Sequence, residues 1–204
     1  MNELPYYRIP ETPENMTATT VLIRLLDGLG FRYRWATEGL RAEDMEFQPC
    51  STSMKVWELL AHIHRLLIVS EEFITGKELE KGTQMRLDER RKKTLDTVVR
   101  IREALLELDD EYLENRMYSP PWDEREFPIW NLINGPLSDV LTHVGQIASW
   151  RRINDNPILG AFVFYGEPPA RAHPSTSYTT SSTQSRDEEQ ERLAGSENGG
   201  TGEN

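Results

Sequence analysis

The fold of this chain is decided by one stretch in its second half, Asn134-Gly135-Pro136-Leu137-Ser138-Asp139-Val140-Leu141-Thr142-His143-Val144-Gly145-Gln146-Ile147. Proline is favoured in the first turn of a helix, because its fixed φ suits the helix and its missing N–H is not needed there. We therefore expect a helix to begin near Pro136 and to end at about residue 154. Asp139 and His143 are four residues apart, so this helix presents a carboxylate and an imidazole on one face.

The same pairing occurs far upstream, in Trp57-Glu58-Leu59-Leu60-Ala61-His62. A second helix is expected over residues 54–75, because N-capping hydroxyls precede it and a glycine follows it. If the two helices face each other, two imidazoles and one or two carboxylates converge, a donor set that suits Zn²⁺, Ni²⁺, Fe²⁺ or Mn²⁺. The sequence therefore predicts a divalent-metal site at His62, Asp139 and His143, with Glu58 as a further candidate. Gln146 shares their face and is expected to orient a ligand or a bound water.

Each of these residues also has an explanation that needs no metal. Asp139 lies in the first turn of its helix, where a carboxylate gains about 0.3–1 kcal/mol from the helix dipole. His62 lies in an apolar run and suits a hydrogen-bonded histidine of the core. Glu58 suits a position on the surface. His64 is about 200° around the helix from His62 and is assigned to the surface.

Two further helices are predicted over residues 16–39 and 87–115, where apolar residues recur every three to four positions. Gly28, Gly30 and Gly145 are interpreted as points where neighbouring helices pack closely. The proline-rich residues 117–128 are expected to form an ordered crossover or lid. Four helices with one apolar stripe each, and no alternating strand pattern, predict an all-α protein with a four-helix bundle over residues 16–168.

The two ends of the chain differ from this bundle in composition. Residues 1–15 contain three prolines and are expected to form an extended leader. Residues 169–204 are rich in Ser, Thr, Gly and Glu. We expect this tail to be disordered, because it has too few large apolar side chains to offset the entropy of ordering.

Composition excludes several classes of function. The net charge of -11 over 204 residues argues against a nucleic-acid partner, which requires a basic face. No apolar run reaches about 18 residues, so no membrane span is expected, and the first residues do not read as a signal peptide. The single cysteine, Cys50, excludes an internal disulfide and fits the reducing cytoplasm. It lies in a loop, and nothing in the sequence pairs it with a histidine as a nucleophile.

These stretches together resemble the DinB/YfiT-like superfamily of metal-binding four-helix bundles. The resemblance rests on residues 57–62 and 135–147, followed by Arg151-Arg152 and Asn156-Pro157, and it covers about residues 16–168. The family commonly uses one histidine from the second helix and a His-x-x-x-His pair from the fourth. His62 and His143 match two of these positions, and Asp139 stands where the family has its other histidine. Two outcomes stay open: a site of two histidines and one carboxylate, or weakened or lost metal affinity.

The resemblance also implies an architecture and a chemistry. The bundle would run up-down-down-up, frequently as a homodimer, with nickel or zinc bound. Characterised relatives include transferases and isomerases that depend on low-molecular-weight thiols. The expected function is therefore metal-dependent transfer of a thiol, or a related hydrolysis or isomerisation, on a small electrophilic substrate in the cytoplasm. The alternatives are a non-catalytic metal-binding stress-response or interaction bundle, and a member without metal that has only a structural role.

Overall fold

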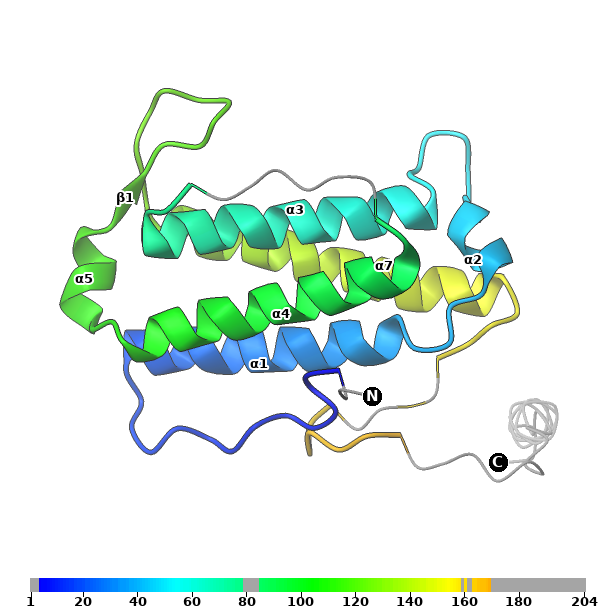
Figure 1. The fold of residues 1–204 in the computed structure, drawn as a ribbon, viewed down its shortest axis with the longest axis horizontal. Helices are drawn as coiled ribbons and strands as arrows, with labels where there is room; N and C mark the ends of the chain where they lie inside the picture. Colours follow the sequence, from blue (N-terminus) through cyan, green and yellow to red (C-terminus); the bar gives the residue numbers. More distant parts are fainter. Residues whose placement is uncertain (1–3, 79–84, 159, 161–162, 170–204) are drawn as a thin grey trace, which may run out of the picture. The chain divides into compact units, whose positions relative to one another are not determined.

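The computed structural model describes residues 4–78, 85–158, 160 and 163–169, which leaves the predicted tail outside the described residues from residue 170 onward. In chain order the elements are α1 (Ala18–Ala36), α2 (Ala42–Glu46), α3 (Val56–Thr75), α4 (Leu87–Leu106), α5 (Asp110–Asn115), β1 (Met117–Tyr118), β2 (Phe127–Pro128), α6 (Ile129–Leu132), the π-helix η1 (Ile133–Leu137) and α7 (Ser138–Ile153) (Figure 1). The described part of the chain is mostly helical, with one two-stranded sheet, and this confirms the all-α class. No described helix is long and apolar enough to cross a membrane.

Four long helices, α1, α3, α4 and α7, make up most of this structure. In Figure 1, α1 and α7 run in one direction and α3 and α4 run in the opposite one. The parallel course of α3 and α4 also follows from their contacts, since His64 meets Thr94 and, one to two turns later, Glu71 meets Arg100. Parallel neighbours that are consecutive along the chain need a connection that returns over the length of a helix, and residues 79–84 of this connection lie outside the described residues.

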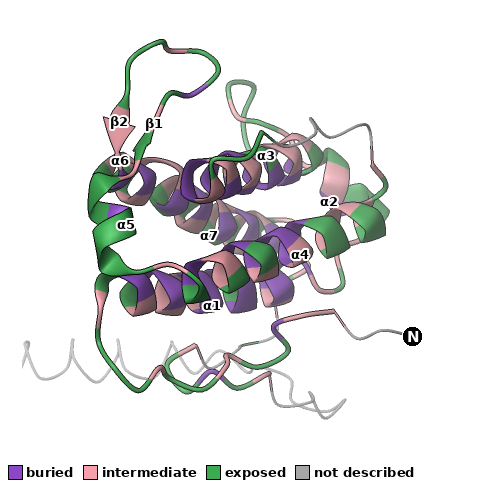
Figure 2. Ribbon diagram, turned by 60° about the vertical axis from the view of Figure 1, so that its left-hand side comes forward, coloured by how far each residue is buried: buried purple, intermediate pink, exposed green. Residues whose placement is uncertain are grey.

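The core lies between the four long helices. Their buried apolar residues recur at intervals of three and four, so each helix buries one face, shown in purple in Figure 2. Burying one such side chain stabilises the fold by about 1.5–3 kcal/mol. The principal members of this core are Leu22, Ile23, Leu26 and Leu29 on α1, Leu59, Leu60, Ile63 and Leu67 on α3, Leu95, Val98, Ile101 and Leu105 on α4, and Val140, Val144 and Ile147 on α7.

Local signals explain where three helices begin or end. The prediction that the second helix stops before Gly76 is confirmed, because Gly76 adopts φ 70°, a left-handed conformation that glycine takes without strain. The predicted helix over 87–115 is wrong in its last part. It ends at Leu106, and the Asp109 carboxylate accepts a hydrogen bond from the Tyr112 N–H at 2.8 Å to begin the separate helix α5. The region expected as a crossover or lid contains the β1–β2 hairpin, which pairs Tyr118 with Phe127.

The predicted start of the fourth helix near Pro136 agrees with the structure. The short helix α6 precedes it from Ile129, and the backbone kinks at Gly135 between α6 and the helix that continues as α7. Pro136 has no N–H to donate and its ring crowds the preceding turn, so the regular helix cannot pass through it. Gly135 absorbs the distortion with φ -95° and ψ -107°, and the Ser138 hydroxyl donates to the Ile133 carbonyl at 2.6 Å.

The extended leader is docked against α1. Tyr6 is buried, and its ring lies against Gly30, where a Cβ atom would come within 2.6 Å of the ring. The close approach expected at Gly30 is therefore made by an aromatic side chain of the leader and not by a helix. Further along, the Ile9 N–H donates to the Gly166 carbonyl at 3.0 Å, so the leader also pairs with the segment that follows α7.

Arg151 fixes the end of α7 to the end of α1. Its buried guanidinium donates to the carbonyls of Ala36 at 2.9 Å, Glu38 at 2.6 Å and Asn156 at 2.9 Å. Carbonyls at a helix C-terminus have no partner within their own helix. This one side chain satisfies the last carbonyl of α1 and carbonyls of the segments that follow α1 and α7. The contact holds the C-terminal end of α7 against the rest of the bundle. It therefore also affects the position of Asp139 and His143, which lie in the N-terminal half of the same helix.

Candidate metal centre

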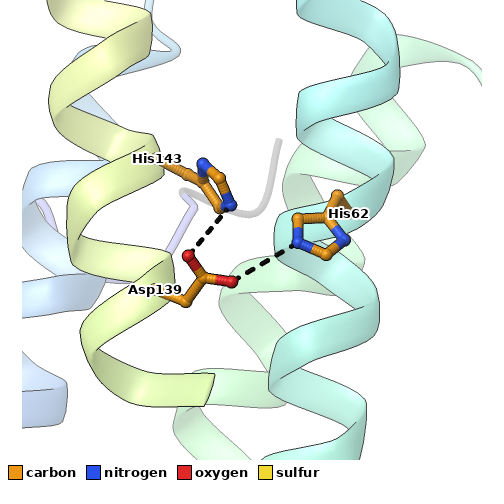
Figure 3. Close-up of side chains that lie close together, drawn as sticks. All are labelled: His62, Asp139 and His143. Carbon is orange, nitrogen blue, oxygen red and sulfur yellow. Dashed lines mark ion pairs between the residues drawn. The ribbon is translucent and has the colours of Figure 1, made fainter. Parts of the chain in front are cut away.

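Three of the predicted ligands come together between α3 and α7 (Figure 3). His62 projects from α3, and Asp139 and His143 project from α7. Each residue offers one ligand atom, and the three atoms lie within 4.8 Å of one another. Nε2 of His62 is 3.5 Å from one Asp139 oxygen, and Nε2 of His143 is 3.2 Å from the other.

The pattern of buried residues on each helix turns these side chains toward one another. His62 lies between buried Leu59 and Ile63 on α3, and His143 precedes buried Val144 on α7. Both histidines stand at the edge of an apolar stripe, so their rings are held by packing while their nitrogens reach the gap between the helices. The two rings meet edge to face, with centroids 4.9 Å apart and an interplanar angle of 73°.

Gln146 holds the ring of His143 from the other side. It lies three residues further along α7, and its Oε1 is 2.8 Å from Nδ1 of His143. With the amide oxygen as the acceptor, Nδ1 carries the hydrogen and Nε2 of the neutral ring presents a lone pair toward Asp139. A lone pair and a carboxylate oxygen 3.2 Å apart repel each other unless a proton or a metal ion lies between them. The arrangement therefore favours a cation at this point.

The electrostatic surroundings keep His62 in the form that binds metals. Partial burial lowers the pKa of the His62 imidazole below its ordinary value, and the neighbouring His143 lowers it further. The Asp139 carboxylate acts in the opposite direction, but the net result is a lowered pKa. His62 is therefore mostly neutral at neutral pH, and a metal would not have to displace a proton from it.

Asp139 and His62 fit a metal site better than they fit the explanations that need no metal. Within the described residues, no backbone N–H donates to the Asp139 carboxylate, whose two oxygens face histidine nitrogens instead. The His62 side chain is 21% exposed and reaches the edge of the bundle, which differs from a histidine enclosed in the core.

Glu58 lies outside this cluster. Its carboxylate accepts a hydrogen bond from the Lys55 N–H at 2.7 Å, which satisfies a free donor at the start of α3. Glu58 and His62 both line an open pocket of about 430 Å³, together with Thr52, Ser53, Met54, Ala61 and Arg65. This pocket gives a small molecule access to the His62 side of the cluster.

The donor set fits a single divalent ion. Two ligands of a tetrahedral zinc ion, each about 2.0–2.2 Å from the metal, lie about 3.3–3.6 Å apart. The separations of 3.2 and 3.5 Å involve different oxygens of Asp139, and the three ligand atoms lie within 4.8 Å of one another, so small side-chain movements would bring them to this edge length around one ion. Two imidazoles and one carboxylate would leave coordination positions open for water or a substrate, as in catalytic sites.

The sequence-based assignment of His64 to the surface is wrong. The prediction places it on the surface, but it is 7% exposed and its Nδ1 lies 3.2 Å from the Thr94 hydroxyl on α4. The helix α3 packs against α7 on one side and α4 on another, so a residue pointing away from His62 is still buried. Cys50 is exposed, and its thiol lies 3.4 Å from the Thr52 hydroxyl.

Comparison of this chain with family models, with curated proteins and with solved structures found no match. What the cluster binds must therefore be inferred from its own side chains.

Proposed function

We propose that this chain belongs to the DinB/YfiT-like superfamily and binds one divalent transition-metal ion, zinc or nickel, through His62, Asp139 and His143. The observation that carries the proposal is the convergence of these three donors, from two helices, within 4.8 Å. The directions of the long helices agree with the superfamily's up-down-down-up order, since α1 and α7 run one way and α3 and α4 the other (Figure 1).

The proposed reaction is the transfer of a thiol to a small electrophilic molecule, or a related hydrolysis or isomerisation. A bound metal ion would supply a nucleophile at neutral pH, by lowering the pKa of a coordinated thiol or water. The residues of the chain have separate roles around it. Asp139 offsets part of the ion's positive charge, Gln146 holds the His143 ring in its tautomer, and the pocket beside His62 receives the reactants. Arg65 at this pocket favours reactants with an anionic group.

The experiment is the metal content of protein purified without a histidine tag or chelator, measured by mass spectrometry. We expect close to one ion per chain in the parent protein, and its loss in His143→Ala and Asp139→Ala. Glu58→Gln is the matched control, because Glu58 lies beside the cluster but outside it, and this variant should keep its metal. Stoichiometric metal in His143→Ala, or none in the parent after reconstitution, would refute the proposed site.

A graded test uses Gln146→Leu, which removes the hydrogen bond to His143 and leaves the three ligands in place. Loss of a residue that orients a ligand weakens metal binding by about 10–100-fold. Competition with a chromophoric chelator measures this change directly. An affinity equal to that of the parent would show that Gln146 has no part in the site.

Catalysis requires a separate measurement. A screen that pairs low-molecular-weight thiols with electrophiles should reveal turnover that a chelator abolishes and that zinc or nickel restores. The competing function is non-catalytic metal binding by a stress-response or interaction bundle. Bound metal without turnover, and without any thiol binding at the pocket beside His62, would favour that alternative.

A further inference from the structure

A second and larger pocket lies between α1 and α7, away from the candidate metal centre. Its volume is about 610 Å³, within the range of about 300–1,000 Å³ usual for small-molecule sites. On α7 it is lined by Leu141, Val144 and Ala148, which lie on the side of the helix opposite Asp139 and His143. On α1 its walls include Leu25 and Trp35.

Two glycines, one on each helix, leave this space open. A Cβ atom added at Gly28 or at Gly145 would meet no atom within 4 Å, whereas one at Gly30 would strike the Tyr6 ring. Close packing explains Gly30 but not the other two. Glycine inside a helix costs about 0.5–1 kcal/mol relative to alanine, so an unfilled position at both sites has a cost in stability with no packing gain. A ligand that occupies the space would account for both residues.

Two arginines give the pocket a positive charge. Arg24 and Arg32 line it from α1, although the chain as a whole has a net charge of -11. Arg24 donates to the Pro10 carbonyl at 2.9 Å, which holds the leader beside the pocket. Among the described residues, Arg32 is exposed and has no hydrogen-bond or ion-pair partner. Its guanidinium is therefore free to bind an anionic group.

The leader and the segment after α7 complete the walls. Ile9 and Val163 both line the pocket, and the hydrogen bond between the Ile9 N–H and the Gly166 carbonyl joins their two segments. The pocket is thus bordered by four parts of the chain, and it is not simply the exposed face of one helix.

We propose that this pocket binds an amphipathic monoanion, a carboxylate with an alkyl or aryl body. The apolar body lies between α1 and α7 over Gly28 and Gly145, and the carboxylate pairs with Arg32. This binding is independent of the proposed metal site, because the pocket and the metal cluster lie on opposite sides of α7.

The test is isothermal titration with decanoate, and with decanol below its solubility limit as the uncharged counterpart. Gly145→Leu and Gly28→Leu each place a side chain in the pocket from one wall, at positions where a Cβ atom meets nothing within 4 Å, and either should weaken decanoate binding by about tenfold or more. Arg32→Gln should weaken decanoate by about tenfold and leave decanol nearly unchanged, because only decanoate loses a charge-assisted hydrogen bond. Arg152→Gln is the charge-matched control, since Arg152 is exposed and lines neither pocket, and it should bind decanoate as the parent does.

Binding should also persist in His143→Ala, which separates this proposal from that of the metal site. Circular dichroism melting confirms that each variant is folded. The proposal is overturned if the parent does not bind decanoate, or if both glycine variants bind it as the parent does. It is equally overturned if light scattering shows that the parent is a dimer and Gly145→Leu a monomer, and decanoate does not bind. In that case a second copy of the chain covers the pocket.

Discussion

The buried histidine His64 makes a quantitative prediction about stability in acid. Burial, together with the nearby cations Arg90, Lys93 and Arg100, lowers the pKa of this imidazole to about 4, from an ordinary value of 6.5. The perturbation is the variant His64→Asn, which keeps a polar atom near the position of Nδ1, within reach of Thr94, but does not titrate.

The sign and size of the effect follow from these two pKa values. Between pH 6.5 and pH 4 the unfolded chain binds a proton at His64 that the folded protein does not, so the free energy of unfolding falls as the pH falls. The contribution is present in full above pH 6.5. The difference in pKa corresponds to about 3.4 kcal/mol when complete, and about 2.5 kcal/mol of it is lost by pH 4.5.

The assay is urea unfolding of the metal-free parent and of His64→Asn at several values between pH 8 and pH 4.5. All other titrating groups, including the metal-site histidines, are common to both proteins and cancel in the difference. We expect the parent to lose about 2.5 kcal/mol more than the variant over this interval. Parallel curves for the two proteins would show that the folded protein does not hold His64 in its neutral form, and would refute the reasoning.

Two further predictions concern packing, and both are measured by urea unfolding at neutral pH. Gly30→Ala should destabilise the protein by about 1–3 kcal/mol, because its methyl group meets the Tyr6 ring. The matched change Gly28→Ala should stabilise it by about 0.5–1 kcal/mol, and equal effects at the two glycines would contradict the docked position of the leader. Arg151→Met should destabilise the protein by about 3 kcal/mol by leaving helix-end carbonyls buried without a donor. An unchanged free energy of unfolding would mean that water replaces the guanidinium.

The convergence of the three site residues could be predicted because helix geometry alone fixes most of it. The four-residue spacing from Asp139 to His143 is independent of the rest of the fold, and the apolar stripes of α3 and α7 determine which faces meet. The identity of the ion and the reaction stay predictions, since they depend on a ligand and a substrate. The role of Glu58 was harder to assign, because the same carboxylate suits a ligand position and a helix N-terminus.

The features that could not be predicted depend on contacts between distant parts of the chain. The burial of His64 follows from the packing of α4 against a second side of α3, and an apolar stripe does not show how many neighbours a helix has. Likewise, the sequence marks Gly30 as a point of close approach but does not show that Tyr6 fills it. The break before α5 was a local signal in principle, because Asp109 is a good N-cap, but the apolar periodicity continues across it.

The kink at Gly135 and Pro136 has a consequence for how this protein could vary in descent. Because the helical backbone is interrupted there, no continuous hydrogen-bond ladder couples the direction of α6 to that of α7. An insertion or deletion between residues 133 and 137 would reposition α6, with its exposed Trp130, relative to α7. The spacing from Asp139 to His143 stays the same. Length changes at the kink can therefore alter the surface presented before α7 while the ligand positions are inherited intact.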